Sequence, residues 1–145
     1  MSNYSLFLIM FFGGMAVALQ PSINARLAQK IGILESACIS FAVGTLVLLL
    51  VVFISGRGNL KGIYSATWWE LTGGILGALF VSLTILVVPR IGTAATMAAI
   101  IAAQLTTGLV LDHFGLFGFK VFPFDLKRLM GLAFLTLGAG LMIRH

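Results

Sequence analysis

The chain has 145 residues, of which 60% are hydrophobic and 9% are charged, and its net charge is +5. An ordinary soluble domain carries about 25% charged residues, and a fold of this size cannot hide so much apolar surface from water. The composition therefore excludes a water-soluble protein and predicts an all-α integral membrane protein.

The positions of the charges divide the chain into apolar spans. A helix needs about 20 apolar residues to cross a hydrocarbon core of about 30 Å. The charge-free stretches predict transmembrane helices at about 4–24, 34–55, 71–88 and 92–111. A fifth, at 129–143, is short, but Lys127, Arg128 and Arg144 at its ends can extend to the headgroups. We therefore expect five transmembrane helices in a single transmembrane domain, residues 1–145.

The first predicted helix ends in the polar stretch "ALQPSINARLAQK". Gln20 and Asn24 are four residues apart and share a helix face. Pro21 cannot donate a backbone hydrogen bond, which frees the carbonyl of Val17 and favours a kink or break. Transporters build binding sites at such broken helices. The alternative is a polar helix end at the membrane interface.

The second predicted helix begins near Glu35 and carries small residues at Ser36, Ser40 and Gly44, which suit helix packing. A carboxylate in a first turn is favoured by the helix dipole, so Glu35 either caps the helix or couples transport to protons. Cys38 lies in the apolar span and is expected to be a packing residue rather than a disulfide or metal ligand.

The third predicted helix follows aromatic residues typical of a membrane interface, Tyr64, Trp68 and Trp69. Gly73 and Gly77 then form a GxxxG pair, which predicts a close contact with another helix.

The fourth predicted helix has two different faces. At about 100° per residue, one face is a polar stripe, and the opposite face is alanine-rich. The stripe consists of Thr93, Thr96, Ile100, Gln104 and Thr107, and the opposite face includes Ala94, Ala98 and Ala102. The alanine face suits helix packing. Gln104 needs a polar partner inside a bilayer, so it either ties helices together or lines a substrate path.

A phenylalanine-rich loop, residues 112–128, is predicted between the last two helices. We expect it to lie along the bilayer surface or over the end of the bundle. Asp112 and His113 stand where the fourth helix leaves the membrane. They either end the helix and hold loop amides, or they take part in proton coupling, since histidine can exchange a proton near neutral pH.

Positive charges give almost no preferred orientation. With five helices, the N-terminal side holds five cationic residues, Arg57, Lys61, Lys120, Lys127 and Arg128. The other side holds four, Arg26, Lys30, Arg90 and Arg144. The excess of Lys and Arg normally selects the cytoplasmic side. Either a feature outside this count fixes one orientation, or the chain inserts both ways and forms an antiparallel dimer, a ten-helix bundle of inverted repeats.

Several classes of function lack their motifs. The sequence has no Walker glycine loop, no spacing typical of metal ligands and no acid–base pair within its spans, so we expect neither an enzyme nor a cofactor or metal. The basic residues are scattered singly, which does not favour a nucleic-acid partner.

The chain resembles the small five-helix, YdcZ-like family of the drug/metabolite transporter superfamily. The resemblance covers nearly the whole chain and is carried by "ALQPSINARLAQKIG", "WWELTGGILGALFV" and "VPRIGTAATMAAIIAAQLTTGLVLDHFGLFG". It implies a multi-pass inner-membrane protein that works as a dimer of opposed topology or as paired half-proteins. It singles out Gln20, Asn24, Gln104, Asp112 and His113.

These features together predict a secondary transporter of a small metabolite or drug, which acts by alternating access in an antiparallel homodimer. The expected substrate-binding residues are Gln20, Asn24, Gln104 and Thr107, and the candidates for proton coupling are Glu35, Asp112 and His113. The first helix contains no acid, so the site suits a neutral or zwitterionic solute, or an anion near a helix N-terminus. The alternatives are a small ion channel built from an antiparallel dimer and a subunit that assembles or regulates another membrane protein.

Overall fold

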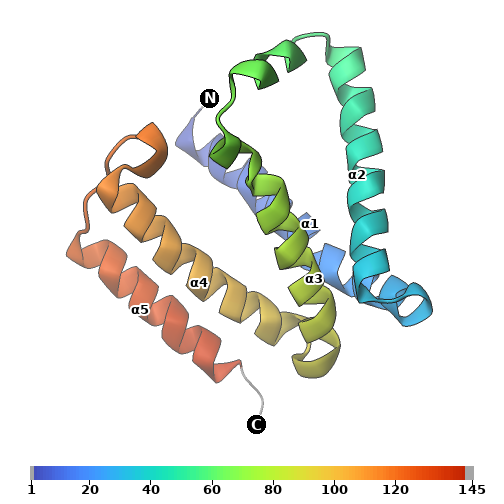
Figure 1. The fold of residues 1–145 in the computed structure, drawn as a ribbon. Helices are drawn as coiled ribbons and strands as arrows, with labels where there is room; N and C mark the ends of the chain where they lie inside the picture. Colours follow the sequence, from blue (N-terminus) through green and yellow to red (C-terminus); the bar gives the residue numbers. More distant parts are fainter. Residues whose placement is uncertain (1, 143–145) are drawn as a thin grey trace. The chain divides into compact units, whose positions relative to one another are not determined.

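The computed structural model describes residues 2–142, and all the regular secondary structure in that range is helical (Figure 1). The chain forms two compact units, residues 1–89 and 90–145. The first contains α1 (Asn3–Ile31), α2 (Ile33–Ser55), the 3-10 helices η1 (Leu60–Ser65) and η2 (Trp68–Leu71), and nearly all of α3 (Gly73–Ile91). The second contains α4 (Thr93–Phe114), η3 (Leu116–Gly118) and α5 (Leu126–Leu141). The predicted all-α class is confirmed.

Helix α1 is longer than the predicted span of about 4–24. Helix α1 runs for 29 residues, and it continues past Pro21 without the predicted break. Arg26 and Lys30 end the apolar stretch but not the helix, because cations are favourable near a helix C-terminus. The helix ends at Gly32, where φ is +103° and the N–H donates to the carbonyl of Ala28. At about 1.5 Å per residue, α1 is about 43 Å long and exceeds the hydrocarbon core.

Polar contacts join α1 to α2. The side-chain amide of Asn24 donates to Ser40 Oγ at 3.2 Å. Ser36, which is completely buried, donates from its hydroxyl to the backbone carbonyl of Asn24 at 2.8 Å. Ser36 and Ser40 of the small seam predicted on the second helix therefore contact α1, whereas a Cβ atom added at Gly44 meets nothing within 4 Å. The carboxylate of Glu35, in the first turn of α2, lies where a side chain at Gly32 would have to go.

A small apolar cluster forms the centre of the first unit. Ala37 of α2 packs with Val81 and Ile85 of α3, and Ala28 of α1 and Phe80 of α3 lie against them. The three helices of this unit therefore meet at side chains located near the α1–α2 turn and in the middle of α3.

The two glycines of the predicted GxxxG pair have different surroundings. A Cβ atom added at Gly77 would lie 3.3 Å from the ring of Phe41 in α2, whereas one added at Gly73 meets nothing within 4 Å. Gly77 therefore accommodates an aromatic ring from α2, and Gly73 lies on an open surface of this single chain.

Helices α4 and α5 lie side by side in the second unit (Figure 1). Helix α4 continues to Phe114, three residues beyond its predicted end at 111, and α5 begins at Leu126, three residues before its predicted start at 129. Asp125 caps α5 by accepting a hydrogen bond from the backbone N–H of Arg128 at 2.8 Å. Charged residues thus belong to both helix ends, and the loop is shorter than the predicted 112–128. Ile143 and Arg144, the predicted end and flank of the last helix, lie outside the described residues.

Within residues 2–142, four helical segments are long and apolar enough to cross a membrane. These are α1, α2, the segment Trp68–Ile91 and α4. Large apolar side chains project outward from them, including Phe7 at 69% exposure and Ile75 at 71%, as expected where lipid or another subunit covers the surface. Helix α5 has 16 residues, about 24 Å, so the fifth crossing stays a prediction.

Candidate functional site

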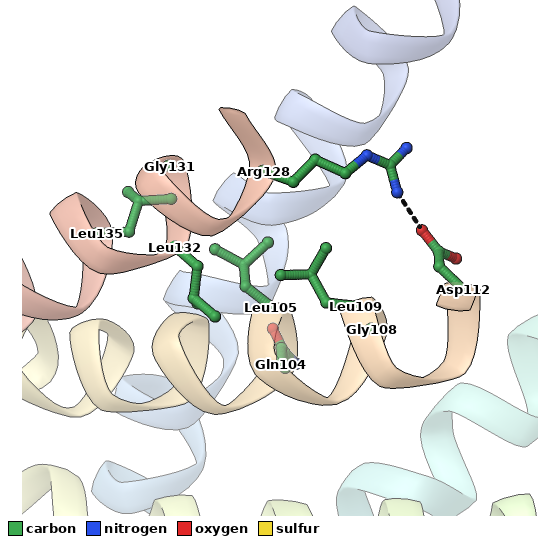
Figure 2. A pocket seen from close by; sticks show the side chains of 9 residues that line it. All are labelled: Gln104, Leu105, Gly108, Leu109, Asp112, Arg128, Gly131, Leu132 and Leu135. Carbon is green, nitrogen blue, oxygen red and sulfur yellow. Dashed lines mark hydrogen bonds and ion pairs between the residues drawn. The ribbon is translucent and has the colours of Figure 1, made fainter. Parts of the chain in front are cut away.

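An open cavity of about 330 Å³ lies between helices α4 and α5 (Figure 2). This volume is at the lower end of the range for small-molecule sites, about 300–1,000 Å³. Its lining consists of Gln104, Leu105, Gly108, Leu109 and Asp112 from α4 and Arg128, Gly131, Leu132 and Leu135 from α5. We call it the α4–α5 cavity.

The spacing of the lining residues explains why the cavity forms between these helices. Positions on α4 and on α5 recur every three or four residues, so each set occupies one helix face. Gly108 and Gly131 contribute no side chain to the interface, which leaves space between the helices. Leucine side chains form the walls on both sides of this space (Figure 2).

An ion pair lies at one end of the cavity. Arg128 Nη1 lies 3.3 Å from Asp112 Oδ2, and the two side chains are 35% and 48% exposed (Figure 2). The Arg128 guanidinium also lies 5.4 Å from the centroid of the Phe122 ring, and its Nε is 4.0 Å from Asp125 Oδ2. The pair is thus accessible, and neighbouring groups orient the arginine.

Gln104 is the polar group farther along α4. It stands eleven residues after Thr93 and ten before Phe114, at the middle of the helix. Its side chain is exposed and makes no hydrogen bond to any described residue. At about 1.5 Å per residue, eight residues separate it from Asp112 by about 12 Å along the axis. An amide at the middle of a membrane-length helix needs a polar partner, since hydrocarbon supplies none.

His113 lies next to the ion pair but does not line the cavity. Its Nδ1 accepts a hydrogen bond from the backbone N–H of Phe124 at 3.2 Å, and its ring stacks on the Phe124 ring with centroids 4.2 Å apart. The backbone N–H of Phe122 donates to the carbonyl oxygen of Asp112 at 2.9 Å. The phenylalanine-rich loop therefore folds back onto the end of α4.

The other predicted site residues are distributed over both units. In the first unit, Gln20 is exposed, Asn24 is buried against α2, and Glu35 is exposed at the start of α2. In the second unit, Thr107 is exposed and does not line the α4–α5 cavity. Among the predicted polar residues, the cavity brings together only Gln104 and Asp112.

The predicted alanine face of α4 has mixed surroundings. Ala98 is buried and lines a second cavity of about 280 Å³ with residues of α5 that include Gly138 and Ala139. Ala94 is exposed, and Ala102 is half-buried. Small residues of the two helices therefore line a common cavity at Ala98.

Arg128 is the site residue that sequence reasoning missed. Its position beside an apolar stretch predicts only a membrane flank. The available signal was its place in the first turn of α5, opposite an aspartate in the last turn of α4. Such a pair meets when two helices are joined by a loop that folds back. Among the described residues, no group of three or more His, Cys, Asp or Glu side chains could hold a metal ion.

The chain is similar to known membrane proteins over almost its whole length. Residues 5–141 match the family described as "Putative inner membrane exporter, YdcZ". Inner membrane protein YdcZ of Escherichia coli (strain K12) is 30% identical over 149 residues, which cover 99% of this chain and 98% of that protein. No solved structure matches the chain.

Proposed function

Because the chain belongs to the YdcZ family of inner membrane exporters, we propose that it is a secondary transporter, which moves a small metabolite or drug by alternating access in an antiparallel homodimer. It is a multi-pass inner membrane protein. The family description names an exporter rather than an enzyme. The transported solute, the mechanism and the dimer are our proposals.

The observation that carries the proposal is the position of Gln104. It is an exposed amide at the middle of a membrane-length helix, it borders a cavity, and it lacks a partner among the described residues. Transporters place their binding groups near the bilayer midplane. A polar solute that binds there would satisfy the amide.

The antiparallel dimer depends on whether α5 crosses the membrane. With five crossings, the two sides hold five and four Lys and Arg residues. If α5 stayed on one side, Arg144 would change sides, and the distribution would become 5 + 1 = 6 against 4 − 1 = 3. The first distribution allows both orientations, and the second selects one. The packing of α5 along α4 supports a crossing, because a helix that accompanies a membrane-spanning helix enters the same layer.

The test of transport uses purified protein in liposomes and a panel of amino acids, amines and organic acids. We expect saturable uptake of at least one solute, which Gln104→Leu abolishes because the leucine cannot hydrogen-bond it. Thr106→Val is the matched control. Its hydroxyl bonds to the carbonyl of Ala102 within α4, and it does not line the cavity. An ion flux through each protein far above the turnover rate of a transporter would instead support an ion channel.

The test of assembly fuses two topology reporters after His145, one active only in the cytoplasm and one active only outside it. Activity from both would support dual insertion and the antiparallel homodimer. Activity from one alone would refute the homodimer. Co-purification with a different membrane protein, without transport by the chain alone, would support an assembly or regulatory subunit.

A further inference from the structure

We infer that the α4–α5 cavity binds a zwitterion on an apolar body, a solute whose carboxylate and ammonium groups lie side by side next to an aliphatic group of leucine size. The inference rests on the proposed function, because it names the class of substrate. It goes beyond that function by assigning the charged end of the site to Arg128 and Asp112.

The first argument is the pairing of two opposite charges at an accessible position. A guanidinium has five N–H donors, and a carboxylate has two acceptor oxygens. The recorded contact between Arg128 and Asp112 uses one nitrogen and one oxygen. Because Arg128 Nε lies 4.0 Å from Asp125 Oδ2, the free N–H groups of the two Nη atoms are the donors that can hold a solute carboxylate, preferably by two bonds. Asp112 Oδ1 can accept a hydrogen bond from a solute ammonium.

The second argument is electrostatic selectivity. A solute with only a negative charge would be attracted by Arg128 but repelled by Asp112 a few ångströms away, and a solute with only a positive charge meets the reverse. A zwitterion of matching orientation gains both attractions. An uncompensated charge is costly to desolvate. The difference in binding free energy between a zwitterion and a singly charged solute therefore grows as the solute enters the apolar cavity.

The third argument is the shape and lining of the cavity. Its walls are apolar and include Leu105, Leu109 and Leu132, while Gly108 and Gly131 leave the interior open. The volume of about 330 Å³ suits a small solute. Gln104, about 12 Å from Asp112 along α4, is uncharged. The far end of the cavity therefore offers hydrogen bonds and no second charge.

The fourth argument is that loop contacts hold the Arg128 guanidinium and the backbone at Asp112 before binding. The ring of Phe122 lies against the guanidinium of Arg128, and the backbone N–H of Phe122 donates to the carbonyl of Asp112. One loop residue thus contacts both members of the pair. A site that is held in this way loses less freedom when the solute binds.

The test uses three probes that share one aliphatic body. L-leucine carries both charges, 4-methylpentanoate lacks the ammonium, and 3-methylbutylamine lacks the carboxylate. We expect L-leucine to bind the purified full chain in detergent, measured by calorimetry and by thermal stabilisation. The affinity for each single-charge probe should be lower by at least about tenfold, since the probe loses a charged hydrogen bond.

Variants assign the two charges separately. Arg128→Gln should remove the advantage of L-leucine over the amine, and Asp112→Asn should remove its advantage over the carboxylate. Lys127→Gln is the matched control, because it makes the same change of charge at an exposed neighbour that does not line the cavity. Leu132→Trp should block binding by filling the cavity with the ion pair intact. Leu137→Trp, at a 67% exposed position outside the lining, should not.

Three results would overturn the inference: no binding of L-leucine to the wild type, equal binding of all three probes, or equal losses for Lys127→Gln and Arg128→Gln. The outcome is separable from that of the proposed function. Transport of another solute without binding of L-leucine keeps the transporter and refutes the zwitterion site. Binding of L-leucine without any transport in liposomes keeps the site and refutes the transporter.

Discussion

Asn24, a predicted substrate residue, contacts Ser40 of α2, so it can instead serve to pack α1 against α2. Asn24 is 6% exposed, and its amide donates to Ser40 Oγ at 3.2 Å. We therefore predict that Asn24→Leu, which preserves the volume but removes the amide, destabilises the α1–α2 pair. Gln20→Leu provides the control, because Gln20 lies one turn earlier on α1, is exposed and makes no side-chain hydrogen bond among the described residues.

The expected coupling free energy between Asn24 and Ser40 follows from the geometry of their contact. A distance of 3.2 Å is at the long end of the usual range for N–H···O bonds. Hydrogen bonds between membrane helices contribute about 0.6 kcal/mol on average and about 1.7 kcal/mol at most. We expect a coupling free energy near the average, about 0.6 kcal/mol, between Asn24 and Ser40, and no loss of stability for Gln20→Leu.

The assay is a double-mutant cycle with Asn24→Leu and Ser40→Ala. Unfolding in mixed micelles, followed by circular dichroism, gives the free energy of unfolding of each variant. A coupling energy of zero would refute the structural role of the contact. If Asn24→Leu also abolished transport without loss of stability, Asn24 would instead be a substrate residue, as the sequence predicted.

Three further predictions concern helix packing, the loop and topology. Gly77→Val should destabilise the fold by about 1–3 kcal/mol, the usual effect of overpacking, because the new side chain meets the Phe41 ring; chemical denaturation in micelles measures this. His113→Ala should free the backbone N–H of Phe124, and hydrogen exchange at that amide should become faster. Lys61→Gln changes five against four cationic residues to four against four, so signals from the paired reporters at the C-terminus should become more equal.

Each of these predictions has a control that can contradict it. Gly73→Val meets no neighbour within 4 Å, so a loss as large as that of Gly77→Val would contradict the packing argument. Exchange at Phe124 that stays as slow in His113→Ala as in the wild type would show that the histidine does not hold the loop. Arg90→Gln changes the distribution to five against three; if it moved the reporters in the same direction as Lys61→Gln, charge would not set the topology.

The structure has a helix at each predicted span, in the predicted order, and four of these helices are long enough to cross a membrane among residues 2–142, but the helix ends differ from the predicted ones. The predicted boundaries followed the charged residues, and a charge ends an apolar stretch without ending a helix. Helix α1 therefore extends beyond Arg26 and Lys30, and the end of α4 includes Asp112. The glycines at positions 32 and 115, both with positive φ, end these two helices.

The sequence by itself determined the membrane environment, the helical class and the family, because these depend on composition, on the length of apolar stretches and on motifs that are local in the chain. It also identified Gln104 and Asp112 as polar groups in or beside an apolar helix. Only the tertiary structure paired Asp112 with Arg128, buried Asn24 against Ser40 and opened a cavity between α4 and α5. Those contacts join residues sixteen positions apart, and they form only when two helices fold back on each other, which no local pattern specifies.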